Sequence, residues 1–122
     1  MMILIAGPYR SGTGDEPARM AENLARLEAA TLPLFRAGHI PLIGEWLALP
    51  LLRQAGSTGP GDAVYEEICY PIAHRLIERC DAVLRLPGAS KGADGDVRRA
   101  HALGLPVYTR LEDIPDVTVL AT

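Results

Sequence analysis

Two carboxylates and a hydroxyl stand close together in the segment 86–96, which reads Leu-Pro-Gly-Ala-Ser-Lys-Gly-Ala-Asp-Gly-Asp. The hydroxyl of Ser90 can hydrogen bond an anion, and Asp94 and Asp96 can each act as a nucleophile or stabilise a positive charge. The segment follows an apolar run and precedes apolar residues at helical spacing, so we expect a turn from the end of a strand into the start of a helix. Such turns bind anions, because free backbone N–H groups and the positive end of the helix dipole face the ligand.

Each charged side chain of this segment has a functional and a non-functional interpretation. Lys91 is the only lysine among the twelve basic residues, and it either adds positive charge to the anion site or is a solvated surface side chain. We expect Asp96, in the first helical turn, to be ionised, because the helix dipole stabilises a negative charge there. The alternative for Asp94 and Asp96 is that both are ordinary first-turn acids without a function.

Short apolar runs alternate along the chain with segments of helical spacing. The expected strands are 2–6, 39–43, 82–86, 106–108 and a possible last strand at 117–120. The expected helices are 17–36, 45–54, 62–79 with Asp62 as its N-cap, and a last helix that ends near 103. This alternation predicts one α/β domain over residues 1–122, with a flavodoxin-like, doubly wound and mainly parallel sheet of four or five strands that helices cover on both faces.

The position of a ligand follows from this fold class. Ligands of such sheets bind beyond the carboxyl ends of the strands, at the point where the strand order reverses. For a strand order of 2-1-3-4-5, the loops 7–16 and 87–96 flank that crevice. We therefore expect Tyr9, Ser90 and Asp96 to line one cavity. Tyr9 then contacts the ligand there, and the alternative is that it packs against the first helix.

The composition is that of an ordinary soluble globular protein, with 48% hydrophobic and 22% charged residues and a formal net charge of −3. Acidic and basic residues are interspersed, which predicts no nucleic-acid partner and no membrane-surface partner. The apolar start Met1–Ala6 is too short for a secretory leader, and the apolar stretch 40–52 is interrupted by polar and helix-breaking residues, so we expect a cytoplasmic protein. Cys69 and Cys80 show neither the spacing nor the neighbouring histidines of a metal site, so we expect no metal site.

Several short motifs occur in a defined order along nearly the whole chain. They are Ile-Ala-Gly-Pro-Tyr at 5–9, Cys-Asp-Ala-Val at 80–83 before Leu-Pro-Gly at 86–88, the pattern Ser90-x-Gly92 with an acid at 96, Ala100, and Leu-Gly-x-Pro-Val at 103–107. In their order and spacing these motifs resemble the nucleoside 2-deoxyribosyltransferase-like superfamily. That group includes nucleoside deoxyribosyltransferases and nucleoside 5′-monophosphate N-glycosidases.

The resemblance implies a role for each matched residue. In the enzymes of the family, a carboxylate six residues after the serine attacks the anomeric carbon, and Asp96 occupies that position, with Asp94 as the alternative nucleophile. The serine and adjacent loop amides bind the sugar 5′-oxygen or phosphate, which here concerns Ser90, Lys91 and Gly92. The first loop lines the base and sugar pocket in the family, which here concerns Gly7, Pro8, Tyr9 and Arg10.

The resemblance implies an N-glycosidase that hydrolyses the N-glycosidic bond of a nucleoside or a (deoxy)nucleoside 5′-monophosphate, without metal or organic cofactor. Asp96 stands where the family usually has Glu, so one alternative is a protein of the same fold that binds a nucleotide or related phosphate without turnover. A second alternative is a deoxyribosyltransferase, in which an Asn near the C-terminus of a neighbouring subunit enters the site, whereas the only Asn here is Asn23. A third alternative is a protein that assembles with other chains through its exposed helices, so that these helices and not the crevice carry its function.

The family also implies self-association, because its members are usually homo-oligomers with sites near subunit contacts. The predicted helices 45–54 and 62–79 are both rich in large aliphatic residues. Such surfaces are commonly buried between identical subunits. We therefore expect a homodimer or a dimer of dimers.

Overall fold

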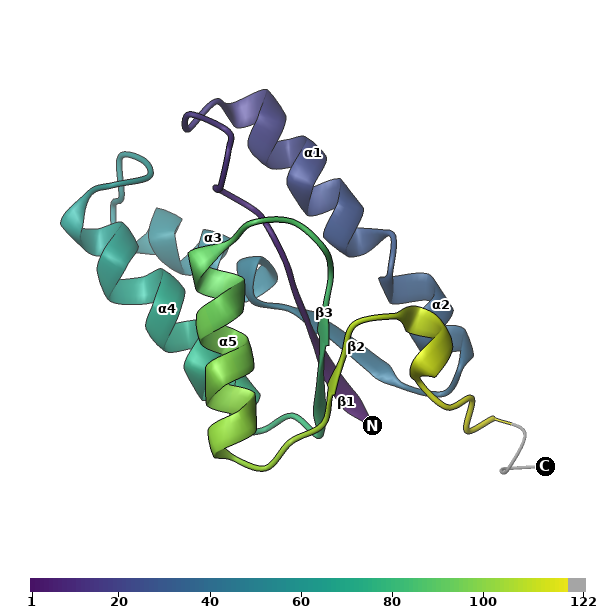
Figure 1. Ribbon diagram of the computed structural model, residues 1–122. Coiled ribbons are helices and arrows are strands. Elements are labelled where there is room, and N and C mark those ends of the chain that lie inside the picture. Colours follow the sequence, from purple (N-terminus) through teal and green to yellow (C-terminus); the bar gives the residue numbers. More distant parts are fainter. Residues whose placement is uncertain (119–122) are drawn as a thin grey trace.

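Strands and helices alternate in the computed structural model, which describes residues 1–118 (Figure 1). The strands are β1 (Met2–Ala6), β2 (Ile40–Ile43), β3 (Ala82–Arg85) and β4 (Val107–Tyr108). The helices are α1 (Pro17–Glu28), α2 (Thr31–Arg36), α3 (Gly44–Gln54), α4 (Ala63–Ile77), α5 (Lys91–Ala102) and the short 3-10 helix η1 (Leu111–Asp113).

The four strands form one parallel sheet in the order β2-β1-β3-β4. The central strand β1 pairs on both sides, so that Ile3 lies opposite Pro41 of β2 and Ala82 of β3. Helices α1 and α2 cover one face of the sheet, α4 and α5 cover the other, and α3 packs along α4 (Figure 1). The α/β class and the doubly wound parallel sheet predicted from the sequence are therefore confirmed.

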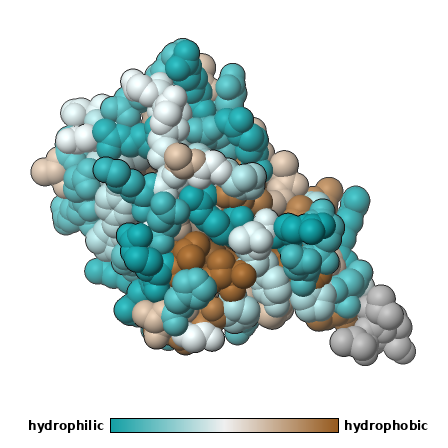
Figure 2. Space-filling view, viewed as in Figure 1, coloured by the Kyte–Doolittle hydropathy of each residue, from teal (hydrophilic) through white to brown (hydrophobic). Residues whose placement is uncertain are grey.

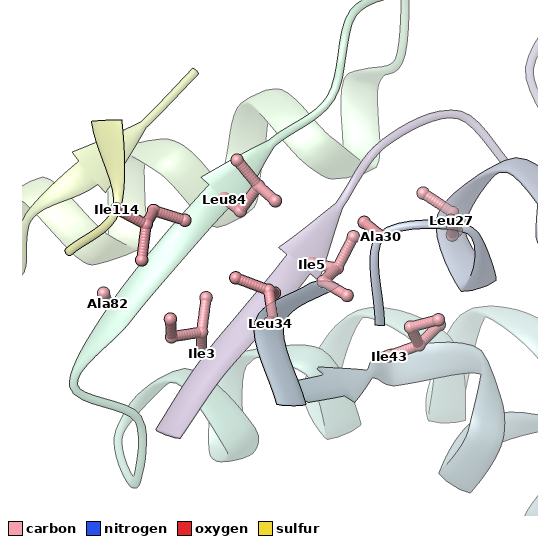
Figure 3. Close-up of a cluster of buried hydrophobic side chains, with 9 residues drawn as sticks. All are labelled: Ile3, Ile5, Leu27, Ala30, Leu34, Ile43, Ala82, Leu84 and Ile114. Atoms are coloured by element: carbon pink, nitrogen blue, oxygen red, sulfur yellow. The ribbon is translucent and has the colours of Figure 1, made fainter. Parts of the chain in front are cut away.

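Successive side chains of β1 point to opposite faces of the sheet and are all apolar, which explains why both faces need a layer of helices. Ile3 and Ile5 point into the cluster beneath α1 and α2, which Figure 3 shows, and Leu4 and Ala6 point into the cluster beneath α4 and α5. All four side chains are at most 3% exposed. A strand buried on both faces is a continuous apolar run, which is how residues 2–6 read in the sequence.

The helix expected over 17–36, with a possible bend at Pro33, is two helices with a break at residues 29 and 30. Pro33 is the physical reason, because proline lacks the N–H that would bond to the carbonyl of residue 29, and its ring clashes with that carbonyl in a continuous helix. In the observed fold Pro33 lies in the first turn of α2, where a missing N–H is tolerated. The hydroxyl of Thr31 donates a 2.6 Å hydrogen bond to the carbonyl of Glu28 across the break.

Two other expectations about the C-terminal half need correction. Helix α5 begins at Lys91, so the second half of the segment 86–96 is helical and Asp96 lies in the second turn, not the first. Residues 117 and 118 are not in a strand, and the remainder of the possible strand 117–120 lies outside the described residues. The N-cap predicted at Asp62 is confirmed, since its carboxylate accepts a 2.7 Å hydrogen bond from the backbone N–H of Tyr65.

Candidate active site

A cavity of about 110 Å³ lies at the carboxyl ends of the central strands, where the strand order reverses between β1 and β3. Its walls come from the end of β1 and the following loop, the first two turns of α3, one side of α4 and the start of α5. Tyr9, Ser90 and Asp96 all line it, which confirms the expectation that they share one cavity. Three further residues selected from the sequence also line it, namely Gly7, Arg10 and Gly92.

The other three residues selected from the sequence do not line the cavity. The carboxylate of Asp94 accepts a 2.9 Å hydrogen bond from Arg85, whose guanidinium also donates to the carbonyls of Leu86 and Gly88. Asp94 thus ties the loop after β3 to α5, with a side chain that is 59% exposed. Pro8 packs closely against Gly88, and Lys91 is exposed.

The carboxylate of Asp96 is the most perturbed acid of the cavity. Its side chain is 15% exposed, and burial raises its pKa from 3.8 to about 7, with the negative charge of Glu45 raising it further and Arg85 opposing the shift. The expectation of a fully ionised Asp96 at the helix N-terminus is wrong for this reason. In the second turn the side chain lies away from the free N–H groups and loses water without gaining a partner that compensates. Nε2 of His74 lies 3.9 Å from Oδ1 of Asp96.

A second acid, Glu45, lines the same cavity; its position after the expected strand 39–43 places it at the edge of the crevice, although it was not assigned a role from the sequence. It is the second residue of α3, immediately beyond the carboxyl end of β2. Burial raises its pKa, against the opposing effect of a hydrogen bond from its own backbone N–H. The position of Glu45 in the sequence indicates that it belongs to the site, because an acid directly after a parallel strand lies at the edge of the sheet where ligands bind.

Aromatic and sulfur-containing side chains also line the cavity, namely Tyr9, Tyr65, Cys69 and Tyr70. Burial raises the pKa of Tyr9 and of Cys69, and the charge of Glu45 raises both further. Burial also raises the pKa of Tyr65. Tyr9, Tyr65 and Cys69 are therefore neutral near pH 7.

The loop after β1 is held by two separate sets of contacts. Asn23, which is buried in α1, donates a 2.7 Å hydrogen bond to the backbone carbonyl of Tyr9 and accepts one from Arg26. Arg10 donates hydrogen bonds of 2.6 and 3.2 Å to Asp15, and its guanidinium lies 5.3 Å from the ring centre of Tyr65. Arg10 therefore lines the cavity with much of its charge already balanced by Asp15.

Ser90 is the N-cap of α5 and is 8% exposed. Its hydroxyl oxygen accepts a 3.1 Å hydrogen bond from the backbone N–H of Ala93, which leaves its O–H free to donate towards the cavity. The serine thus has a structural role in addition to any contact with a ligand.

We expect Ser90→Ala to lower the free energy of unfolding by about 1 kcal/mol, because the capping acceptor for Ala93 is lost. Urea unfolding measures the change. Ser90→Thr keeps the hydroxyl and is expected to retain most of the stability. Equal losses in the two variants would contradict the capping role.

No group of three or more His, Cys, Asp or Glu side chains in residues 1–118 is arranged to hold a metal ion. Within the same range no helix is both long and apolar enough to cross a membrane.

Comparison with protein-family models, curated proteins and solved structures gives no match to this chain. Fold and site together define the class as a doubly wound α/β protein with a two-carboxylate cavity at the point where its strand order reverses.

Proposed function

We propose that the protein is an N-glycosidase that acts on a nucleoside or a nucleoside 5′-monophosphate, with Asp96 as the nucleophile. The observation that carries this proposal is the buried carboxylate of Asp96 in the cavity at the carboxyl ends of the strands. The motif order that resembles the deoxyribosyltransferase-like superfamily supports the same reaction class.

The chemistry requires an anion next to the anomeric carbon. As the bond between the sugar C1′ and the base nitrogen breaks, its electron pair leaves with the base and positive charge develops on the sugar ring. The Asp96 carboxylate stabilises this charge and forms an ester with C1′, and water then hydrolyses the ester to release the sugar and regenerate the acid. Because its pKa is about 7, a substantial fraction of Asp96 is ionised at neutral pH.

The other lining residues have binding roles in this proposal. The free O–H of Ser90 and the backbone at Gly92 contact the sugar 5′-oxygen or its phosphate. Gly7, Tyr9 and Arg10 line the side of the cavity that takes the sugar and base. Gly7 has little room for a side chain, since an added Cβ would lie 2.8 Å from the side chain of Leu27.

A panel of nucleosides and nucleoside 5′-monophosphates, analysed by chromatography for free base, tests the proposal. We expect release of base from at least one member of the panel by the wild-type protein. A second free base added to the reaction distinguishes hydrolysis from transfer, because a transferase produces a new nucleoside. Binding of panel members without release of base would contradict catalysis and favour the alternative of a nucleotide-binding protein.

We further propose that the protein forms a homodimer or a larger homo-oligomer. Large apolar side chains on α2, β2 and α3 are exposed, namely Leu32, Phe35, Ile40, Leu47 and Leu51. The face in Figure 2 is mostly hydrophilic but also carries a compact hydrophobic area. Light scattering at micromolar concentration is expected to give at least twice the mass of one chain, and the mass of a single chain would contradict the proposal.

A further inference from the structure

Two buried polar side chains hold the backbone of the loop that follows β1. Asn23 of α1 is 6% exposed and donates a 2.7 Å hydrogen bond to the backbone carbonyl of Tyr9. Thr13 is 3% exposed, and its hydroxyl donates a 2.5 Å hydrogen bond to the backbone carbonyl of Arg10. The two carbonyls belong to consecutive residues, and both of these residues line the cavity. The supported stretch of backbone is therefore the one that presents Tyr9 and Arg10 to a ligand.

Asn23 occupies a position at which the pattern of α1 favours an apolar residue. Met20 and Leu27, three residues before and four residues after it, are the other buried residues of this helix. A polar side chain there loses water, which is tolerated when its groups find partners. The NH2 of the amide faces the carbonyl of Tyr9, which only accepts, and the amide oxygen faces Arg26, which only donates. Both halves of the amide are used, and one half holds the loop.

Thr13 closes the same loop upon itself. Its backbone N–H also donates to the carbonyl of Arg10, at 3.2 Å, and its hydroxyl oxygen accepts a 3.2 Å hydrogen bond from the N–H of Asp15. Asp15 has a φ of +60°, in the left-handed region that non-glycine residues seldom adopt. Such a residue persists where its surroundings hold it, and here Thr13 and the ion pair with Arg10 do so. The loop thus has a defined shape that depends on Thr13.

From these contacts we infer that Asn23 and Thr13 are positioning residues for substrate binding, which fix the backbone at Tyr9 and Arg10 and so place these two side chains against the substrate. Neither Asn23 nor Thr13 lines the cavity, so each acts on the substrate through the loop. The inference rests on the proposed function, because the substrate is the nucleoside or nucleoside 5′-monophosphate named there.

Removal of each hydrogen bond tests the inference through KM. Thr13→Val replaces the hydroxyl with a methyl group of similar size, and Asn23→Asp replaces the NH2 donor with an oxygen that repels the carbonyl of Tyr9. We expect each variant to raise the KM for base release at least about tenfold and to change kcat less than about threefold, because the loop binds the substrate equally in the ground state and the transition state. Thr13→Ser keeps the hydroxyl and is expected to restore the KM of the wild type to within about threefold.

Thr31→Val is the matched control for Thr13→Val. The hydroxyl of Thr31 donates a 2.6 Å hydrogen bond to the carbonyl of Glu28, which also lies three residues earlier, but this contact is at the break between α1 and α2 and outside the cavity. We expect KM and kcat to be unchanged in this variant. Thermal unfolding of each variant verifies that it is folded.

A double-mutant comparison shows whether the effect passes through Tyr9. Tyr9→Ala removes the side chain that Asn23 is inferred to position. In the Tyr9→Ala background we expect Asn23→Asp to raise KM by less than about threefold, because the contact with the substrate is already absent. A general effect on the fold would act equally in both backgrounds.

The outcomes distinguish the positioning role from the proposed function. Unchanged KM in folded Thr13→Val and Asn23→Asp would overturn the positioning role. The same holds for an equal rise in Thr31→Val, an equal rise in the Tyr9→Ala background, or loss of folding in both variants. Each of these results leaves the N-glycosidase function in place when the wild type releases base.

A wild type that binds members of the panel without release of base would overturn the N-glycosidase function alone. The same comparisons are then made on Kd, from ligand-induced thermal stabilisation, and the positioning role again predicts a rise of at least about tenfold. A wild type that neither binds nor cleaves any member would overturn both proposals.

Discussion

Asp96→Asn is expected to abolish release of base, with a loss of at least about 1,000-fold in kcat, because the amide has no charge to stabilise the transition state and does not form the sugar ester. Binding of substrate is expected to change little, since the carboxylate acts on charge that develops only in the transition state. Base release by chromatography and ligand-induced thermal stabilisation measure the two effects separately.

Asp94→Asn is the matched control, because it makes the same chemical change two residues away and outside the cavity. We expect it to retain most of the activity and to lose only the ion pair with Arg85. If Asp94→Asn loses as much activity as Asp96→Asn, the assignment of the nucleophile is wrong. Asp96→Glu adds one methylene, and higher activity in that variant would indicate a cavity shaped for the longer acid.

The same Asp96→Asn substitution is expected to change stability in a pH-dependent way. The pKa of Asp96 is about 7 in the folded protein and 3.8 for an ordinary aspartate, so the folded state binds the proton more tightly. This contribution to stability is fully present below pH 4 and is lost as the pH rises through about 7.

Asparagine stays neutral at every pH and avoids that loss. We therefore expect Asp96→Asn to be more stable than the wild type at pH 8, by up to about 4 kcal/mol, and to differ little from it at pH 4. Urea unfolding at the two pH values measures the difference. A stability difference that is the same at both would contradict the raised pKa.

The second large effect concerns the core. Leu84 of β3 is fully buried in the cluster between the sheet and the helices α1 and α2 (Figure 3). We expect Leu84→Ala to lower the free energy of unfolding by about 2–5 kcal/mol, because the lost methyl groups leave a cavity that the packed neighbours fill only in part. Urea or thermal unfolding measures this.

Leu103→Ala is the control for the same chemical change, since Leu103 lies just after α5 and is 41% exposed. We expect a cost below about 1 kcal/mol for this variant. Similar losses in the two variants would indicate that Leu84 does not pack as described.

Much of the fold could be predicted because its signals are local. Residues 2–6 and 82–84 are continuous apolar runs, and an entirely parallel sheet buries its strands on both faces and requires such runs. Asp62 before a helical pattern indicates an N-cap, because its short carboxylate reaches the free N–H groups of the first turn. The shared cavity of Tyr9, Ser90 and Asp96 also follows from the sequence, because the carboxyl ends of parallel strands meet at one edge of the sheet.

The choice between Asp94 and Asp96 required the tertiary structure. Because Asp94 and Asp96 are two residues apart on a helix, their side chains point about 160° apart around its axis, so only one of them can enter the cavity. Which one does so depends on where α5 begins and how it packs on the sheet, and the 86–96 segment alone predicted a start several residues too late.

The sequence by itself determined the alternation of strands and helices, the edge of the sheet that holds the cavity, and the residues that follow each strand, because each is a property of a short segment. Only the tertiary structure decided the protonation of Asp96 and the place of Glu45 beside it. Those depend on loss of water and on charges from residues distant in sequence, since Glu45 and Arg85 reach Asp96 only once β2, β1 and β3 lie side by side.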